Sequence, residues 1–121
     1  MVFEDIIEGH NQPVVEVVNY LRQLITSLDP EIEEGIYGGK VVKMASYSIG
    51  RADNVIAVVG PASNHTKLFL HHTDIIDAKG LKLEGKGKHA KHIKIPQLQF
   101  IDQSLYRDVL LQVVAIVKTK V

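Results

Sequence analysis

Three apolar segments separated by very short polar turns are the feature of this sequence that most restricts its fold. Residues 41–49, 55–59 and 66–71 are rich in Val, Ile, Tyr and Phe, which are residue types typical of β-strands. Short turns that begin with glycine, 50–54 and 60–64, separate them. A crossover between parallel strands needs a dozen or more residues, so these segments are predicted to be antiparallel neighbours.

A further strand and two long helices complete the expected fold. Residues 89–95, which a proline follows, predict another strand. Asn11 predicts the start of a helix, because apolar residues then recur at spacings of three and four as far as Leu28. Asp102 likewise predicts the start of a helix that runs to about Lys118.

The residues that follow the first helix predict a second, brief helix. Pro30 suits the first position of a helix, Gly35 suits its exit, and the carboxylates between them, Glu31, Glu33 and Glu34, suit its positive N-terminal end. The whole order predicts an α+β fold, in which an antiparallel sheet of three to five strands packs against N- and C-terminal helices. The two long helices would cover one sheet face, so function is expected on the other.

The composition indicates one domain with a real core, since 121 residues with 45% hydrophobic and 23% charged content suit a single globular unit, 1–121. The absence of cysteine excludes disulfides, thiolate metal sites and cysteine nucleophiles. The first eleven residues carry no Lys or Arg, unlike a secretory signal, and the longest strongly apolar run, 55–59, is far short of the ~20 residues that cross a bilayer. We expect a cytoplasmic protein with no membrane partner.

Opposite charges are separated along the chain although the totals, 14 basic and 14 acidic residues, cancel. Residues 1–34 hold eight acidic residues and one arginine, a balance of −7, whereas residues 65–95 hold seven lysines and three acidic residues, a balance of +4. These surfaces are either simply solvated, or they attract each other within the fold or across a possible homodimer.

The sharpest local feature is a segment rich in glycine, lysine and histidine. Glycines let the backbone approach a ligand closely, and lysines with exposed amides suit an anion such as phosphate or carboxylate. The predicted ligand-binding residues are Gly85, Lys86, Gly87, Lys88, His89, Lys91 and His92. The alternative is a structural glycine hairpin whose lysines only add solubility. A nucleotide P-loop is excluded, because Gly87 stands where a magnesium-binding Ser or Thr is required and a strand follows instead of a helix.

No metal or catalytic motif stands out. His89 and His92, three residues apart on a predicted strand, would not share a face, and no resident cofactor is expected. Carboxylate side chains are the alternative ligands for a hard cation such as iron. The acidic residues concerned are Glu4, Asp5, Glu8, Glu31, Glu33 and Glu34.

Nothing in the sequence requires an enzyme, since it has neither a Gly-x-Ser-x-Gly elbow nor a cysteine nucleophile. An enzyme that acts on a small anionic substrate through Lys88 and His92 is kept as an alternative. The lysine-rich part of the chain has almost no arginine and few aromatic residues, so we expect no specific nucleic-acid partner.

Residues 15–118 resemble the YdhG-like domain-of-unknown-function family. The strongest likeness is the string Leu-Glu-Gly-x-Gly-Lys-x-x-(Arg/Lys)-His-(Ile/Val), which begins here at Leu83 and ends at Ile93. Residues 35–40 and 45–47 add to the likeness. Many relatives carry Arg where this chain has Lys91, and lysine lacks the planar, fixed donor geometry of arginine.

The resemblance implies a compact α+β domain with a frataxin-like layout and an unassigned biochemical role. Some members of the family have been labelled frataxin-like iron chaperones. We therefore expect a small non-enzymatic binding or interaction domain that takes an unknown small anion or protein partner. An iron chaperone that uses the acidic N-terminal region is the alternative.

Overall fold

A computed structural model describes the whole chain, residues 1–121. The α-helices are α1 (Glu4–Ile7), α2 (Gln12–Thr26) and α3 (Gln103–Lys118). The strands are β1 (Ile32–Gly38), β2 (Lys43–Ile49), β3 (Val55–Pro61), β4 (Thr66–His71) and β5 (Ala90–Ile95), and a 3-10 turn, η1 (Leu98–Phe100), precedes α3. None of these helices has both the length and the apolar character required to pass through a membrane.

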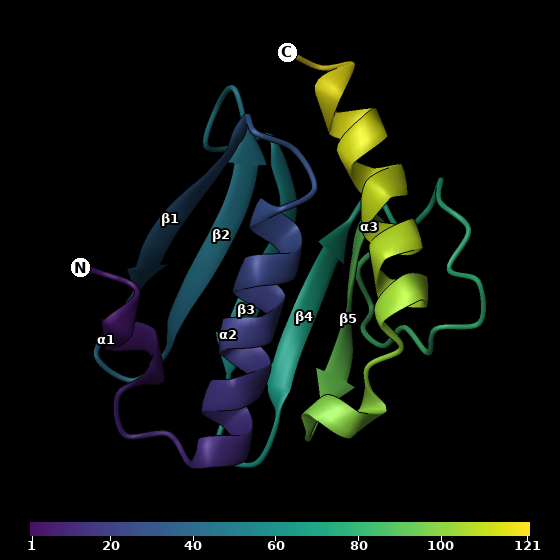
Figure 1. Cartoon of the computed structure of the whole chain (residues 1–121). Coiled ribbons are helices and arrows are strands. Elements are labelled where there is room, and N and C mark those ends of the chain that lie inside the picture. The colour runs from purple at the N-terminus through teal and green to yellow at the C-terminus, as the bar shows by residue number, and fades with distance from the viewer.

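The five strands form one antiparallel sheet in the order β1-β2-β3-β4-β5. Figure 1 shows α2 and α3 on the same side of the sheet, running in the same direction. Helix α2 packs on β1, β3 and β4, α3 packs on β2, β3 and β4, and α1 joins them on that side against β2 and β3. The predicted α+β fold, with an antiparallel sheet and helices from both ends of the chain, is confirmed.

Both long helices begin at the predicted residues. The side chain of Asn11 accepts a hydrogen bond from the Val14 amide (3.2 Å), and the side chain of Asp102 accepts one from the Leu105 amide (3.2 Å). Each bond satisfies a backbone donor that has no partner within the helix.

The core lies between the helices and the sheet, and it is one cluster of 24 buried residues. Leu21 and Ile25 of α2 and Val113 and Val117 of α3 are fully buried in it. Burial of a Leu or Ile side chain is worth about 1.5–3 kcal/mol, so this layer is the main stabilising element of the fold. It also leaves the opposite sheet face without a covering helix.

The prediction of a short helix at residues 30–35 is wrong, because this segment enters the sheet as β1. Ile32, Glu34 and Ile36 pair with Ile49, Tyr47 and Ala45 of β2 on the helix-covered side. The local helix signals of the proline and glutamates were real, but pairing with a complete neighbouring strand outweighs such weak preferences.

Candidate ligand-binding site on the open face of the sheet

The sheet surface that faces away from α2 and α3, here called the open face, is made by every second residue of the strands, because side chains alternate between the two sides of a strand. In β4, Leu68 and Leu70 point into the core, so Lys67, Phe69 and His71 lie on the open face. By register the other strands add Glu33, Gly35, Tyr37, Met44, Ser46, Ser48, Val55, Val58, Gly60, Ala90, His92 and Lys94.

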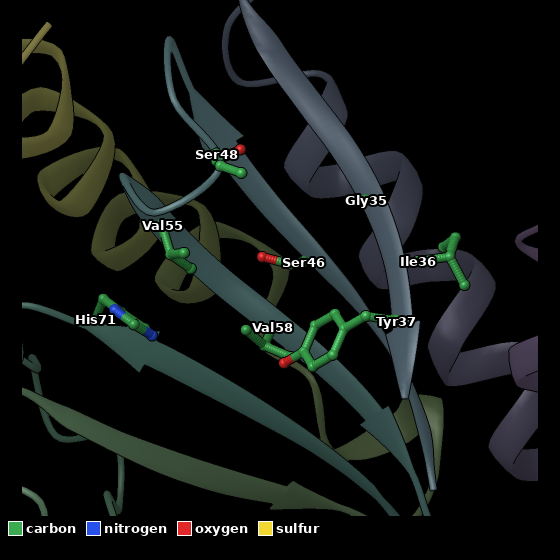
Figure 2. Close-up of a pocket in the computed structure, with 9 residues that line it drawn as sticks. Gly35, Ile36, Tyr37, Ser46, Ser48, Val55, Val58 and His71 are labelled. Carbon is green, nitrogen blue, oxygen red and sulfur yellow. The ribbon is translucent and has the colours of Figure 1, made fainter. Parts of the chain in front are cut away.

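Two hollows adjoin on this face. The larger has a volume of about 420 Å³, and Ser46, Ser48 and Val55 help to line it. The smaller has a volume of about 230 Å³, and Met44, Phe69 and Ala90 help to line it. The two hollows share three lining residues, Tyr37, Val58 and His71. In Figure 2 the ring of Tyr37 extends from β1 toward Val58, which lies between Tyr37 and His71 in this view.

The hollow exists because the residues beneath it are small. Gly35 has no side chain, and a Cβ atom added there would meet nothing within 4 Å. Its cross-strand partner is Ser46, and next to it Ser48 lies beside a β-bulge between Tyr47 and Ser48. The floor is nevertheless well packed, since Val58 is only 7% exposed. A ligand of moderate size would therefore find a depression with an apolar floor.

Two polar side chains in the hollow lack strong partners. The hydroxyl of Tyr37 contacts only the weakly accepting sulfur of Met44, at 3.7 Å. His71 is half-buried and makes no side-chain hydrogen bond within the chain. Burial, and after it the charge of His72, lowers the pKa of His71 below its usual value of 6.5. At neutral pH the site thus offers an uncharged imidazole, which both donates and accepts a hydrogen bond.

The predicted segment Gly85–His92 is divided by the structure: Gly85–His89 form an exposed loop at the edge of the sheet, and Ala90–His92 begin β5. Glu84 and His92 exchange two backbone hydrogen bonds, of 2.8 and 2.9 Å, which close the base of the loop. Gly85 has a φ of +115°, in the region that favours glycine, and a Cβ atom on Gly87 would lie 2.5 Å from the backbone oxygen of Ala90. Both glycines are therefore required by the turn itself.

The charged residues of the loop are only partly occupied by internal contacts. The Nζ atom of Lys91 donates a hydrogen bond to the Gly85 carbonyl (3.1 Å), and His89 pairs with Asp74 at 2.9 Å. Lys86 and Lys88 are exposed and form no ion pair. Two of the predicted cations thus remain free to meet a ligand.

The loop side chains do not converge on a common cavity. Neither Lys88 nor His92 lines any hollow of the molecule. The ring of His92 instead packs against Phe69 on the open face, with ring centroids 5.4 Å apart. The structure therefore brings His92 to the open face beside the smaller hollow and leaves Lys86 and Lys88 exposed to solvent on the loop.

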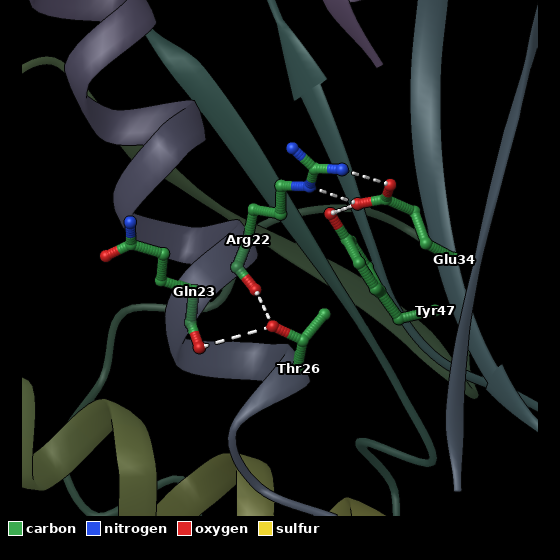
Figure 3. Close-up of polar contacts among 5 residues, drawn as sticks. All are labelled: Arg22, Gln23, Thr26, Glu34 and Tyr47. Carbon is green, nitrogen blue, oxygen red and sulfur yellow. Dashed lines mark hydrogen bonds and ion pairs between the residues drawn. The ribbon is translucent and has the colours of Figure 1, made fainter. Parts of the chain in front are cut away.

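The acidic residues proposed for iron are divided among separate contacts. Glu34 accepts hydrogen bonds from Arg22 and from the Tyr47 hydroxyl (Figure 3). Asp5 accepts one from the Val2 amide. The structure holds no group of three or more His, Asp or Glu side chains placed to ligate a metal ion. The iron alternative stays a prediction with no assembled site to support it.

The residues that shape the hollow were missed by sequence reasoning. The open face was expected as the functional side, but Gly35 was assigned to the exit of the predicted short helix, and Tyr37 lay outside every predicted strand. The alternation in residues 66–71 carried a usable signal, because it places Phe69 and His71 on the side opposite Leu68 and Leu70.

Comparison with known proteins adds no information about this site. No protein-family model, no curated protein and no solved structure matches the chain.

Proposed function

We propose that this protein is a small non-enzymatic binding domain whose ligand lies in the hollow of the open face. The observation that carries the proposal is the shared wall of Tyr37, Val58 and His71, where an apolar floor meets polar groups without strong partners. Ligand sites combine these features: a mostly apolar depression and a few polar atoms that orient the ligand.

The chemistry of the hollow favours a flat, largely apolar ligand. Tyr37 and Phe69 provide aromatic surfaces, and Val58 and Met44 provide aliphatic and thioether surface between them. His71 and the hydroxyl of Ser46 supply hydrogen bonds at the side of the larger hollow. An aromatic ring system with one hydrogen-bonding substituent matches this lining.

The exposed loop Gly85–His89 is proposed as the rim of the same site. Ala90, the first residue of β5 after the loop, lines the smaller hollow, and His92 packs on Phe69 of its floor. The loop lysines would then attract an anionic ligand toward the hollow rather than hold it in a closed cavity.

The test uses 2-naphthol as a probe and follows backbone amide signals by NMR. The key variant is Gly35→Leu, which fills the larger hollow and meets no atom within 4 Å of its Cβ. Gly39→Leu is the matched control, because a Cβ there also meets nothing within 4 Å and Gly39 lines no hollow. Both variants are expected to fold.

We expect 2-naphthol to shift the amides of Val58, Phe69 and His71 in a saturable manner. Gly35→Leu should abolish the shifts of Val58 and His71, which line the larger hollow that it fills, whereas Gly39→Leu should leave all the shifts unchanged. Saturable shifts that both variants retain equally, or the absence of shifts on the open face at millimolar probe, would overturn the proposal.

A further inference from the structure

Lys67 and Lys94 stand directly opposite each other on β4 and β5. Both belong to the open face, since their neighbours Leu68 and Ile93 point into the core. Like charges placed directly across an antiparallel pair destabilise a sheet. This pair therefore costs stability in the unliganded protein.

No carboxylate relieves the repulsion by direct contact. Neither Lys67 nor Lys94 forms an ion pair within 4.0 Å. Glu84 is the acidic residue whose charge acts on the neighbouring His65, and its effect is smaller than that of Lys67, Lys94 or His92. The positive charge of the two lysines is therefore available to an anion from outside the chain.

His65, in the turn before β4, adds an unfilled hydrogen-bonding position. Its Nδ1 atom contacts the side-chain oxygen of Asn64 at 2.7 Å, but its Nε2 atom is buried and has no hydrogen-bond partner. Burial, followed by the charges of Lys67 and Lys94, lowers the pKa of His65. Because the Asn64 oxygen can only accept, Nδ1 carries the proton, and the unpartnered Nε2 atom becomes a donor to an anion once His65 is protonated.

We infer that Lys67, Lys94 and His65 form an anion subsite of the open face, and that the ligand is a small aromatic phosphate monoester. This inference rests on the proposed function, because the aromatic part of the ligand would occupy the hollow. Two lysine ammonium groups suit a phosphate, which is a multivalent acceptor. Lys67 is two residues from Phe69 on β4, a step of about 6.6 Å, so one small molecule can reach both.

The test compares 2-naphthyl phosphate, 2-naphthol and inorganic phosphate as probes. Lys67→Gln and Lys94→Gln remove one charge each and keep a long polar side chain. Lys120→Gln is the matched control, because Lys120 acts on His72, at the opposite end of β4 from Lys67. Affinities come from amide shifts, and the pKa of His65 comes from its ring signals during a pH titration.

We expect 2-naphthyl phosphate to bind more tightly than either 2-naphthol or inorganic phosphate. Lys67→Gln and Lys94→Gln should each weaken the binding of 2-naphthyl phosphate about fivefold, as expected for a partly exposed charge pair. Lys120→Gln should leave this affinity unchanged. Bound phosphate should also raise the pKa of His65. Lys94→Glu should lose the phosphate preference and gain thermal stability, since it places opposite charges across the strands.

The possible failures are distinct. Equal binding of 2-naphthyl phosphate and 2-naphthol, with no response to the lysine variants, would refute the anion subsite and leave the binding domain standing. Binding of inorganic phosphate as tight as that of 2-naphthyl phosphate would refute the aromatic ester as the ligand class. Absence of open-face shifts with every probe would refute both proposals.

Discussion

Arg22 of α2 and Glu34 of β1 are joined by two hydrogen bonds, of 2.8 and 3.0 Å, between guanidinium and carboxylate. The Tyr47 hydroxyl donates to the same carboxylate at 2.8 Å, and the ring of Phe3 lies 3.8 Å from the guanidinium carbon of Arg22. Burial, and then the Glu34 carboxylate, raise the pKa of Tyr47. This polar cluster fastens the edge strand β1 to α2 on the covered side of the sheet (Figure 3).

Glu34→Gln is expected to lower the free energy of unfolding by about 1–2 kcal/mol, because it weakens three charge-assisted hydrogen bonds at a mostly buried group. The adjacent Glu33 is exposed on the opposite side of β1 and forms no ion pair. Glu33→Gln should therefore change stability by less than about 0.5 kcal/mol. Urea unfolding of both variants measures the difference, and equal values would contradict the role given to the cluster.

Gly87→Val is expected to destabilise the protein more than Lys88→Ala. A Cβ at Gly87 would lie 2.5 Å from the backbone oxygen of Ala90, so the loop must open, at a cost of about 1–3 kcal/mol. Lys88 is exposed and unpaired, and its truncation should cost less than about 0.5 kcal/mol. Melting temperatures of the two variants provide the check, and equal values would refute the steric requirement at Gly87.

Stability is expected to fall as the pH is lowered from neutral to about pH 5. Burial lowers the pKa values of His65, His71 and His72 in the folded protein, with smaller effects from nearby positive charges. As the pH falls, these histidines take up protons near pH 6.5 in the unfolded chain, before they do so in the folded protein. The stability that the three histidines contribute is therefore complete above pH 6.5 and is lost as the pH falls toward their folded pKa values.

His71→Gln should make this decline shallower, because the variant lacks one of the three shifted groups. Urea unfolding at several pH values measures the slope. A slope identical to that of the unmodified protein would show that His71 does not contribute.

Asn54→Ala is expected to destabilise the protein by about 2 kcal/mol. The buried Asn54 amide donates to the carbonyls of Ile49 (2.9 Å) and Val117 (3.0 Å), and so ties the β2–β3 turn to the end of α3. Asn19→Ala is the control, since Asn19 is exposed on α2. Chemical denaturation should show little change for Asn19→Ala, and an equally small effect at Asn54 would contradict the link.

The long helices and β4 could be predicted because their signals are local. Asn11 and Asp102 cap helices in the way their side chains favour, and residues 66–71 alternate as a half-covered strand does. β1 could not be predicted, because its glutamates and glycines have poor strand preference. The segment is a strand because it pairs with β2, and the contacts of Arg22 and Tyr47 with the Glu34 carboxylate add to that pairing.

The candidate site also has a part that could be predicted from the sequence and a part that could not. Residue order alone singled out the segment Gly85–His92 and its lysines, because glycines and charges are visible without coordinates. The hollow at Gly35 and Val58 and the opposition of Lys67 to Lys94 emerged from strand register. Register depends on pairing between segments far apart in the chain, and a shift of one residue would have turned each of these side chains to the other face.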